Sequence, residues 1–529
     1  MIQIGGKVPL AASGDSFAVA TPHSAATAAA VASFHAGGNA VDAALAASVV
    51  LAVVYPHMCG PGGDLFAVLA DGHTQAVVNG SGAAAAGVDA ERIRRHHPTM
   101  PEFGALSVTV PGTVAAWVEL AQRYGRLPLA AAIAPGVEHA SRGIAVSMSL
   151  ARAIVAHKAR IERDSALRQT FAPGGHPLVV GDLLKLPALA ATLRSVADVG
   201  AASFYHGRIG ATLASHLSRL GSPITADDFR EHATEVSRPI QRLYRNFQVV
   251  VPPPNSQGFV LLEILACIEQ SGIPGACFDN KAGVIAELFL QASADRDRVL
   301  ADPRRRPVPI SELLSSSYDR FVRSQGRRSS RHRSGARRTS GDTVGIVVAE
   351  KRGLWVSINQ SLYESFGSGL LEPETGVLYH NRGAAFSLEP SSANYLVGSM
   401  RPPHTLMPVI VLKDGNPVVA SATMGGSAHA QIHTQILVGI LDRHLPASSA
   451  VARPRWLVGG LERKIGRVIV AERRVPKGVL ASLRASGFSV EMLDAWDERV
   501  GHAQLVCRLK EGDFSAASDP RADGGAAAY

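Results

Sequence analysis

The spacing of hydrophobic positions predicts helices packed against a sheet in the first part of the chain. From Ala40 onward, small apolar residues recur at helical spacing, and the longest largely apolar run, Ala43–Val54, has 12 residues. This pattern predicts a buried helix. The run is too short to cross the ~30 Å apolar core of a bilayer, so it does not indicate a membrane protein. The glycine-rich residues 60–63 end the helix, and Leu65–Ala70 is typical of a strand.

Turn and cap residues mark further elements along the chain. The stretch VPGTVAAWVELAQRYG (110–125) begins with proline and glycine and ends with glycine, which predicts a helix. Helical patterns then dominate as far as Leu220, and VVVPPPNSQGFVLLEIL (249–265) predicts a strand, a turn and a helix. Beyond residue 343, short strands are joined by hairpin turns such as EKRG and LKDGNP. Helices that flank antiparallel strands predict a layered α+β domain.

A basic segment separates these two parts of the chain. The protein has 529 residues and a formal net charge of +9, and seven arginines lie between Arg323 and Arg338 with no acidic residue among them, so the other residues together carry +2. Arginine mixed with serine and glycine is typical of a solvated, disordered linker, which we expect at 323–342. The charge therefore does not indicate a nucleic-acid partner, since no aromatic platform or binding module accompanies it.

Cysteine usage and the N-terminus bear on the cellular compartment. Cys59, Cys267, Cys277 and Cys507 form no CxxC pair and no metal-ligand spacing, which is typical of reduced thiols in a cytosolic protein. The first residues, MIQIGGKVPLAASGDSF, lack the basic start and the apolar core of a signal peptide. We therefore expect a cytoplasmic protein that uses no metal and no cofactor.

Thr343 is the leading candidate for a nucleophile. It lies at the junction between the basic linker and the strand-like sequence TVGIVVAE. If the chain were cut before Thr343, the free α-amine of this residue would supply the general base that an ordinary hydroxyl lacks. We therefore expect cleavage between Asp342 and Thr343. The alternative interpretation is that Thr343 simply opens a strand.

A glycine pair downstream is the second candidate feature. Gly425 and Gly426, in TMGGSAHAQIHTQIL, precede a predicted helix, so their backbone N–H groups are suited to stabilise developing negative charge, although an ordinary turn is the alternative. His429 and His433 follow at a spacing of four, but the glutamate and third ligand of a zinc protease are missing, so we expect surface or core histidines. The loop GPGGD (60–64) lacks the Lys–Ser/Thr ending of a phosphate-binding loop.

Ordered stretches along nearly the whole chain resemble the gamma-glutamyltranspeptidase family of N-terminal-nucleophile hydrolases. They are ATPHSAATAAAVASFHAGGNAVDAALA, YPHMCGPGGDLF, VPGTVAAW, PPPNSQG, GDTVGIVV, FGSGLLEPETGVLYHNRGAAFSL, RPPHTLMPVIVLKDGNPV, MGGS and ASDPRADGGAAAY. The resemblance implies an αββα sandwich, made as a precursor that cleaves itself before the threonine. It therefore implies a large chain, 1–342, and a small chain, 343–529, that remain associated with each other.

The resemblance also implies roles for individual residues. Ser361, in SINQSL, matches the hydroxyl residue that hydrogen-bonds the nucleophile, with a strand-surface serine as the alternative. Gly425 and Gly426 match the glycines of the oxyanion hole. His404 and Thr405, in RPPHTLMP, stand where the family has two serines that line the substrate site.

Three positions depart from the pattern of the family's transpeptidases. Val88 stands where they hold the glutamyl α-carboxylate with an arginine, although Arg92 and Arg94 are close in sequence. Ala385 stands where they hold the α-amino group with an aspartate, and Tyr363 replaces an asparagine beside the nucleophile. The scaffold and the nucleophile therefore match the family, whereas the clamp for an amino-acid head does not.

Arg382 offers a replacement for that clamp. It stands where transpeptidases usually have a neutral residue, and its planar guanidinium suits a carboxylate, although a structural ion pair is the alternative. We expect Arg382, Tyr363, His404 and Thr405 to contact the substrate.

The sequence thus predicts a self-processing amidohydrolase or acyltransferase that forms an acyl-enzyme at Thr343 with a small-molecule amide. Two substrate classes remain open: glutathione-type γ-glutamyl amides, and other amides with a carboxylate, such as oxamate or a glutaryl amide. An acyl hydrolase of specialised metabolism is a further alternative, and a non-catalytic binding protein on the same fold is the competing class. The sequence leaves open whether the acyl group goes to water or to an amine, and whether the protein forms a homodimer.

Overall fold

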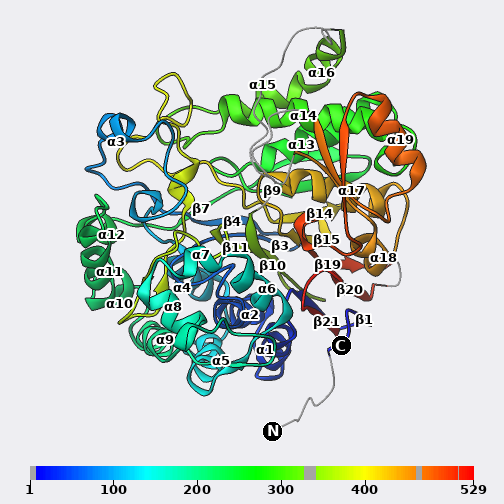
Figure 1. The fold of residues 1–529 in the computed structure, drawn as a ribbon. Coiled ribbons are helices and arrows are strands. Elements are labelled where there is room, and N and C mark those ends of the chain that lie inside the picture. The colour runs from blue at the N-terminus through cyan, green and yellow to red at the C-terminus, as the bar shows by residue number, and fades with distance from the viewer. Residues whose placement is uncertain (1–7, 274, 327–340, 460–466, 510–511) are drawn as a thin grey trace.

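The structure of the protein is a computed structural model that describes residues 8–273, 275–326, 341–459, 467–509 and 512–529. Its centre is a pair of seven-stranded antiparallel sheets stacked face to face (Figure 1). The first sheet has the order β1-β20-β19-β15-β14-β9-β8, with the bounds Ala11–Gly14, Phe514–Ser518, Ala503–Arg508, Asn416–Thr423, Val409–Lys413, Phe247–Val251 and Ile240–Tyr244. The second has the order β21-β2-β10-β11-β3-β4-β7, with the bounds Gly525–Ala528, Phe17–Thr21, Asp342–Glu350, Trp355–Tyr363, Asp64–Ala70, Gln75–Gly80 and Glu235–Ser237.

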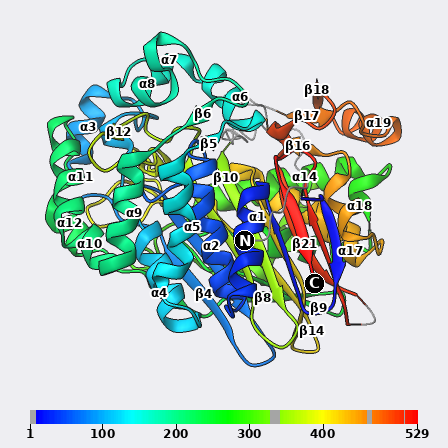
Figure 2. The same cartoon turned by 90° about the horizontal axis from the view of Figure 1, so that it is seen from below.

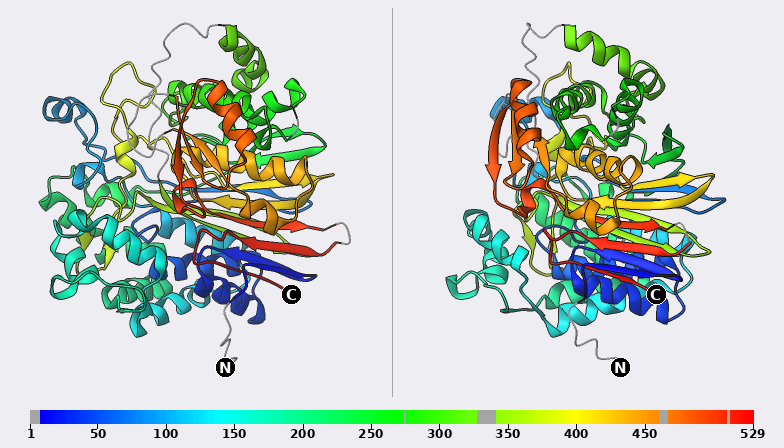
Figure 3. Two further views of the ribbon diagram at one scale, coloured as in Figure 1. Left: turned by 45° about the vertical axis from the view of Figure 1, so that its right-hand side comes forward. Right: turned by 90° about the vertical axis from the view of Figure 1, so that its right-hand side faces the viewer.

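Helices cover the outer face of each sheet. The second sheet is covered by α1 (Ser24–His35), α2 (Ala40–Val54), α4 (Thr113–Tyr124) and α5 (Leu129–Arg142). The first sheet is covered by α13 (Gly258–Ser271), α14 (Ala282–Val299) and α17 (His429–Leu441). Figures 2 and 3 show these helices on opposite sides of the strands. The α+β, four-layer αββα sandwich predicted from the family resemblance is therefore confirmed.

The alternation of side chains along β10 and β11 explains why both faces of the second sheet are apolar. On β10, Val344, Ile346 and Val348 belong to the core under the helices, whereas Val347 and Ala349 belong to the core between the two sheets. Successive residues of a strand point to opposite faces, so one nine-residue strand contributes to both cores. Thr343 shares the face of Val347, which directs its side chain between the sheets.

Most predicted elements occur where the sequence indicated them. The all-buried helix α2, strand β3, helix α4, and strand β9 followed by α13 match the patterns described above. The turns EKRG and LKDGNP connect the hairpins β10–β11 and β14–β15. The predicted helical region extends through α6 (Met148–Ala156), α8 (Ser165–Phe171), α9 (Pro187–Val199) and α11 (Arg208–Arg219). Among the described helices, none is long and apolar enough to cross a membrane.

The predicted linker begins later than the sequence indicated. Helix α16 (Ser317–Gly326) includes the residues from Arg323 to Gly326, and Asp342 already belongs to β10. The helix extends this far because Phe321 is buried and the Arg320 guanidinium donates to Glu263 (2.7 Å). The rest of the predicted linker, residues 327–340, lies outside the described residues.

Strands from both sides of Thr343 share both sheets. In the second sheet, β10 and β11 lie between β2 and β3, and in the first sheet β14 pairs with β9. The chain before residue 343 and the chain after it therefore form one common core, and a cut before Thr343 would leave these contacts intact.

Candidate active site

Thr343 and Ser361 face each other at one end of the β10–β11 hairpin. The strand register pairs the two residues directly, and both are buried, with exposed fractions of 2% and 4%. Thr343 Oγ1 donates to Ser361 Oγ (3.1 Å). Ser361 is therefore not the strand-surface serine of the alternative interpretation, but a buried partner of the Thr343 hydroxyl.

The Ser361 hydroxyl also contacts the peptide bond that precedes Thr343. Ser361 Oγ donates to the carbonyl oxygen of Asp342 (2.6 Å) and accepts from the backbone N–H of Tyr363 (2.8 Å). One hydroxyl thus contacts both the candidate nucleophile and the oxygen of the carbonyl group that it would attack. A hydrogen bond to a carbonyl oxygen stabilises the negative charge that develops there during nucleophilic attack.

The glycine pair lies beside the same peptide. Gly425 and Gly426 connect β15 to α17 with φ values of 152° and 53°, both in the region that favours glycine. A Cβ atom built on Gly341, two residues before Thr343, would lie 2.7 Å from Gly426 Cα. The fold therefore brings the predicted oxyanion-hole residues next to the chain that leads into Thr343.

Gln257 holds this glycine loop in place, and sequence reasoning did not assign it a role. Its Nε2 group donates to the carbonyl oxygens of Gly426 (3.1 Å) and Thr405 (2.9 Å), while its Oε1 accepts from Arg296 Nη1 (3.2 Å). Gln257 belongs to the stretch PPPNSQG, whose match to the family was the available signal.

A small polar cavity of about 60 Å³ lies beside this loop. It contains the four predicted substrate contacts and several residues that the sequence did not single out. Its lining comprises Arg296, Asp297, Leu300, Tyr363, Arg382, Ser392, Asn394, Pro403, His404, Thr405 and Ser427. The structure thus brings Arg382, Tyr363, His404 and Thr405 together.

Arg382 and Arg296 are both buried cations in the lining of the cavity. The exposed fraction of Arg382 is 3%, its guanidinium carbon lies 3.8 Å from the centre of the Tyr363 ring, and its Nη1 donates to Thr405 Oγ1 (3.0 Å). The aromatic face and the hydroxyl fix the orientation of the guanidinium. The buried carboxyl group of Asp64 lies in its surroundings, since the Arg382 charge lowers the pKa of Asp64.

Asp64 is a second residue that sequence reasoning missed. Leu406 N donates to His404 Nδ1 (3.3 Å), so the proton of the neutral ring is on Nε2, which donates to Asp64 Oδ2 (3.0 Å). Burial raises the pKa of Asp64 to about 7, while the Arg382 charge opposes this rise. Burial and the Arg382 charge hold the pKa of His404 well below its usual value. His404 therefore lines the cavity as a neutral ring whose Nε2 is engaged by Asp64.

Asn394 presents a buried acceptor in the cavity. Its exposed fraction is 5%, and among the described residues no donor reaches its Oδ1 atom. A buried polar atom without a partner is rare in proteins and costs about 1–3 kcal/mol, which makes a ligand N–H a natural partner. Asn394 lies in an irregular loop with no motif, so the sequence offered no signal for it.

Arg92 and Arg94, the other arginines considered for the substrate carboxylate, lie away from the cavity. Arg92 and Arg94 belong to α3 (Ala90–His96) at the periphery of the molecule (Figure 1), where both are exposed and Arg94 pairs with Glu91. Neither lines the cavity, and Val88 packs with an apolar cluster next to α3. Ala385 is buried at the end of the short helix that begins with Arg382.

His429, His433 and the GPGGD loop are part of the packing of the fold. His429 and His433 are both buried within α17, as core histidines. Within the described ranges, no group of three or more His, Cys, Asp or Glu side chains is arranged to hold a metal ion. A Cβ atom on Gly63 would lie 2.5 Å from the carbonyl oxygen of Ser361, so this glycine allows close approach of the loop to β11.

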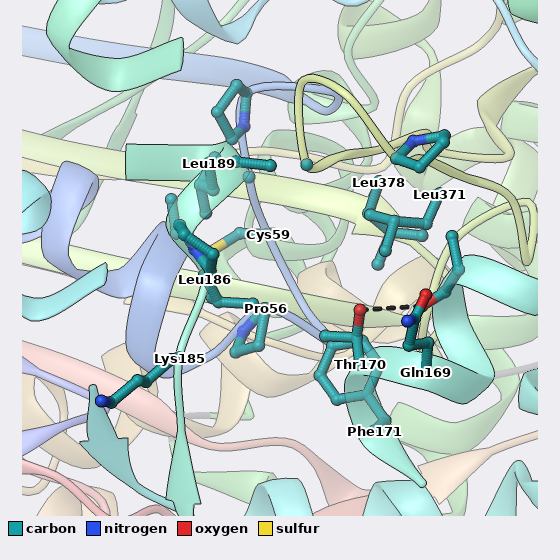
Figure 4. Close-up of a pocket in the computed structure, with 18 residues that line it drawn as sticks. Pro56, Cys59, Gln169, Thr170, Phe171, Lys185, Leu186, Leu189, Leu371 and Leu378 are labelled. Carbon is teal, nitrogen blue, oxygen red and sulfur yellow. Dashed lines mark hydrogen bonds between the residues drawn. The ribbon is translucent and has the colours of Figure 1, made fainter. Parts of the chain in front are cut away.

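A second cavity, of about 190 Å³, is mainly apolar (Figure 4). It lies between α8, α9, the loop Cys59–Pro61 and the hairpin of β12 (Leu371–Glu372) and β13 (Val377–Leu378). Burial holds the pKa of the Cys59 thiol well above its usual value, so this thiol is not an activated nucleophile. None of the residues predicted for the site lines this second cavity.

Comparisons with known proteins agree with this geometry. Residues 26–529 match the family described as Gamma-glutamyltranspeptidase. The chain is 34% identical over 517 residues to the oxamate amidohydrolase proenzyme of Klebsiella pneumoniae subsp. pneumoniae, with 96% of this chain and 97% of the relative covered. It is also 34% identical over 515 residues to the glutathione hydrolase-like YwrD proenzyme of Bacillus subtilis, with 96% and 97% covered.

The structure resembles a solved relative over nearly its full length. The crystal structure of cephalosporin acylase from Bacillus halodurans superposes with a TM-score of 0.89 at 30% identity, covering 98% of this chain and 97% of that chain. Family match, relatives and fold agree, and the chain belongs to the gamma-glutamyltranspeptidase family and is a hydrolase of the N-terminal-nucleophile type.

Proposed function

We propose that the chain cleaves itself between Asp342 and Thr343 and then uses Thr343 as the nucleophile of an amidohydrolase. In the first step, Thr343 Oγ1 attacks the carbonyl carbon of Asp342 and the peptide C–N bond breaks. The hydroxyl proton passes to the departing nitrogen, which becomes the free amine. Water then cleaves the resulting ester, so that Asp342 ends in a carboxylate and Thr343 recovers its hydroxyl. The observation that carries this proposal is the pair of hydrogen bonds from Thr343 to Ser361 and from Ser361 to the Asp342 carbonyl.

Turnover would use the same groups with the new amine as base. The amine accepts the proton of Thr343 Oγ1 as the oxygen attacks the substrate carbonyl, and the leaving amine takes that proton as the amide bond breaks. The backbone N–H groups of Gly425 and Gly426 stabilise the oxyanion, and Gln257 holds their loop rigid. Water then releases the acyl group from Thr343.

We infer that the acyl group is small and has a carboxylate but no α-ammonium group. Arg382 supplies a buried, oriented cation for the carboxylate, while Ala385 supplies no carboxylate for an ammonium. A cavity of about 60 Å³ favours a short acyl group, and the Asn394 Oδ1 acceptor suits an N–H beside it. An oxamate-type amide has both features, and a similar relative is named for oxamate.

A γ-glutamyl amide is the competing substrate class, since a second relative is named glutathione hydrolase-like. Its α-ammonium group would lie in a cavity that contains the guanidinium groups of Arg296 and Arg382, and the Asp297 carboxylate in the lining is already paired with Arg296 (2.8 Å). A charge without a partner in a desolvated site costs several kcal/mol, so we expect γ-glutamyl amides to be poor substrates.

Mass spectrometry of the purified protein tests the cleavage. We expect a fragment that begins at Thr343, two bands on a denaturing gel, and a single full-length band for Thr343→Ala. A persistent full-length chain without activity would favour a non-catalytic binding protein, and a fully active intact chain would refute the mechanism.

The ratio kcat/KM for oxamyl, glutaryl and γ-glutamyl amides tests the substrate class. Arg382→Met removes charge-assisted hydrogen bonds to the carboxylate, so kcat/KM for the two carboxylate amides should fall by about 10–10²-fold. Arg94→Met is the matched control, because Arg94 is exposed and outside the cavity, and its kinetics should not change. If Arg382→Met matures normally and loses nothing, Arg382 is only a structural cation.

A further inference from the structure

Gly341 directly precedes Asp342 and Thr343, between which we propose the cleavage. It packs against the backbone of Gly426 and Tyr363. A Cβ atom built on it would lie 2.7 Å from Gly426 Cα, 3.2 Å from Gly426 N and 3.4 Å from the carbonyl oxygen of Tyr363. Its φ angle is not in the left-handed region, so the backbone conformation does not require glycine. Close contact with Gly426 is therefore the reason that a side chain does not fit here.

The next residue, Asp342, is held by Ser361. The Ser361 hydroxyl donates to the Asp342 carbonyl oxygen at 2.6 Å, directly after the contact between Gly341 and Gly426. The segment Gly341–Asp342 thus lies between the glycine loop and the Ser361 hydroxyl. The position of the Asp342 carbonyl carbon relative to Thr343 Oγ1 depends on both contacts.

We propose that Gly341 is a positioning residue for self-cleavage, one that acts in the precursor and has no part in turnover. By having no side chain, it lets the scissile peptide approach Gly426 closely enough for the Asp342 carbonyl to reach the Ser361 hydroxyl. This inference rests on the proposed cleavage between Asp342 and Thr343. It assigns a function to a residue that becomes the penultimate residue of the large chain after the cut.

The cost of a side chain at this position follows from the distances. Carbon atoms in contact normally lie about 3.5–4.0 Å apart, so an alanine Cβ at 2.7 Å from Gly426 Cα requires a shift of roughly 1 Å. The obstacle is backbone and not the end of a flexible side chain, so the shift falls on the scissile segment itself. Because reacting groups misplaced by about 1 Å lose on the order of 10²-fold in rate, Gly341→Ala should slow self-cleavage by about that factor.

The mature enzyme should not be affected in the same way. After the cut, Gly341 and Asp342 are a chain end, and the free amine of Thr343 replaces the peptide nitrogen. The carbonyl that Thr343 then attacks belongs to the substrate. Turnover per mature site in Gly341→Ala should therefore equal that of the wild type.

The test follows self-cleavage of the full chain over time on a denaturing gel, for wild type, Gly341→Ala and Gly87→Ala. Gly87 is the matched control, because a Cβ atom there meets nothing within 4 Å. We expect Gly87→Ala to mature like the wild type and Gly341→Ala to mature about 10²-fold more slowly, with unchanged kcat once activity is divided by the amount of mature small chain. Maturation of Gly341→Ala at the wild-type rate, or an equal loss in maturation and kcat, would overturn the proposal.

A measurement on uncut protein separates positioning from folding. The precursors Thr343→Ala and Thr343→Ala/Gly341→Ala should melt within a few degrees of each other, since only the scissile segment shifts. An insoluble or strongly destabilised double variant would overturn the proposal, because glycine would then be needed for folding. If the wild-type chain is not cut between Asp342 and Thr343, the proposed function fails independently of Gly341.

Discussion

Replacement of Ser361 by alanine removes a hydroxyl that contacts both the attacking group and the attacked carbonyl group of the proposed cleavage reaction. In the precursor, Ser361 Oγ accepts from Thr343 Oγ1 and Tyr363 N and donates to the Asp342 carbonyl. Alanine leaves the Asp342 carbonyl without this donor and the Tyr363 N–H without its acceptor. We expect slower maturation, a smaller loss in turnover, and a modest loss of stability.

The magnitudes follow from these three hydrogen bonds. Loss of one donor to a developing oxyanion costs about 10²–10³ in rate, so self-cleavage of Ser361→Ala should slow by that factor. An N–H group left without a partner in a buried site lowers the free energy of unfolding by about 1–3 kcal/mol. Turnover should fall less than maturation, because the mature site has the Thr343 amine as base and the glycine loop as a second source of donors.

Ser357→Ala is the matched control for this prediction. Ser357 lies on the same face of β11, is fully buried, and donates to the Ser421 carbonyl (2.8 Å) far from the scissile peptide. Ser357→Ala loses one buried hydrogen bond and Ser361→Ala loses three, so both should lose stability in denaturant unfolding, Ser361→Ala more than Ser357→Ala. Gel densitometry over time measures maturation, and only Ser361→Ala should be slow. If both variants mature at the wild-type rate, the Ser361 hydroxyl has no role in the cleavage step.

Two further predictions concern the oxyanion loop and the buried carboxyl group. In Gly425→Val, the new Cβ atom would lie 2.3 Å from Ile432 Cδ1, and the positive φ of this residue disfavours any side chain. If the loop donates to the oxyanion, kcat should therefore fall by about 10²–10³-fold. Unchanged processing with unchanged kcat would remove the loop from the mechanism. The pKa of Asp64 is raised from 3.8 to about 7, so the folded state keeps a proton that the unfolded state loses, and this contribution to stability declines as pH rises through that window. Asp64→Asn, which has no proton to lose, should show a flatter pH dependence of its free energy of unfolding between pH 4 and 7; parallel curves for the two proteins would contradict the raised pKa.

Local patterns predicted the strands, turns and helices on which the candidate site residues lie, whereas the role expected for Ser361 came from the family resemblance. Thr343, Ser361, and the pair Gly425–Gly426 each lie within a short stretch whose strand, turn or helix signals are contained in the stretch itself. The hairpin turn EKRG sets the register that places Thr343 opposite Ser361. The predicted start of the linker was wrong, because the burial of Phe321 in α16 is a tertiary contact that a run of arginine and serine does not reveal.

The wall of the cavity was harder to predict because it is assembled from distant parts of the chain. Arg296 lies on α14 and Asn394 lies in an irregular loop, while Asp64, which pairs with His404 of the wall, follows a glycine loop. No spacing in the sequence relates these residues. A buried arginine on a helix has the same sequence signature as an exposed one. The pairing of His404 with Asp64 depends on how β3 lies against residues that follow it by more than three hundred positions.

Two departures from the family pattern, Tyr363 and Arg382, are coupled in the structure. Tyr363 has a φ of 78°, a conformation that costs a bulky residue about 1–3 kcal/mol and that an asparagine, the family's residue here, tolerates better. The Tyr363 ring lies 3.8 Å from the Arg382 guanidinium, a cation–π contact worth about 0.5–2 kcal/mol, which offsets part of that strain. The Tyr363 N–H in turn donates to Ser361 Oγ, so the hydroxyl that contacts Thr343 also holds the residue whose ring packs against the Arg382 guanidinium. An exchange of Arg382 alone would leave the strained tyrosine uncompensated, and an exchange of Tyr363 alone would leave the guanidinium without its aromatic support.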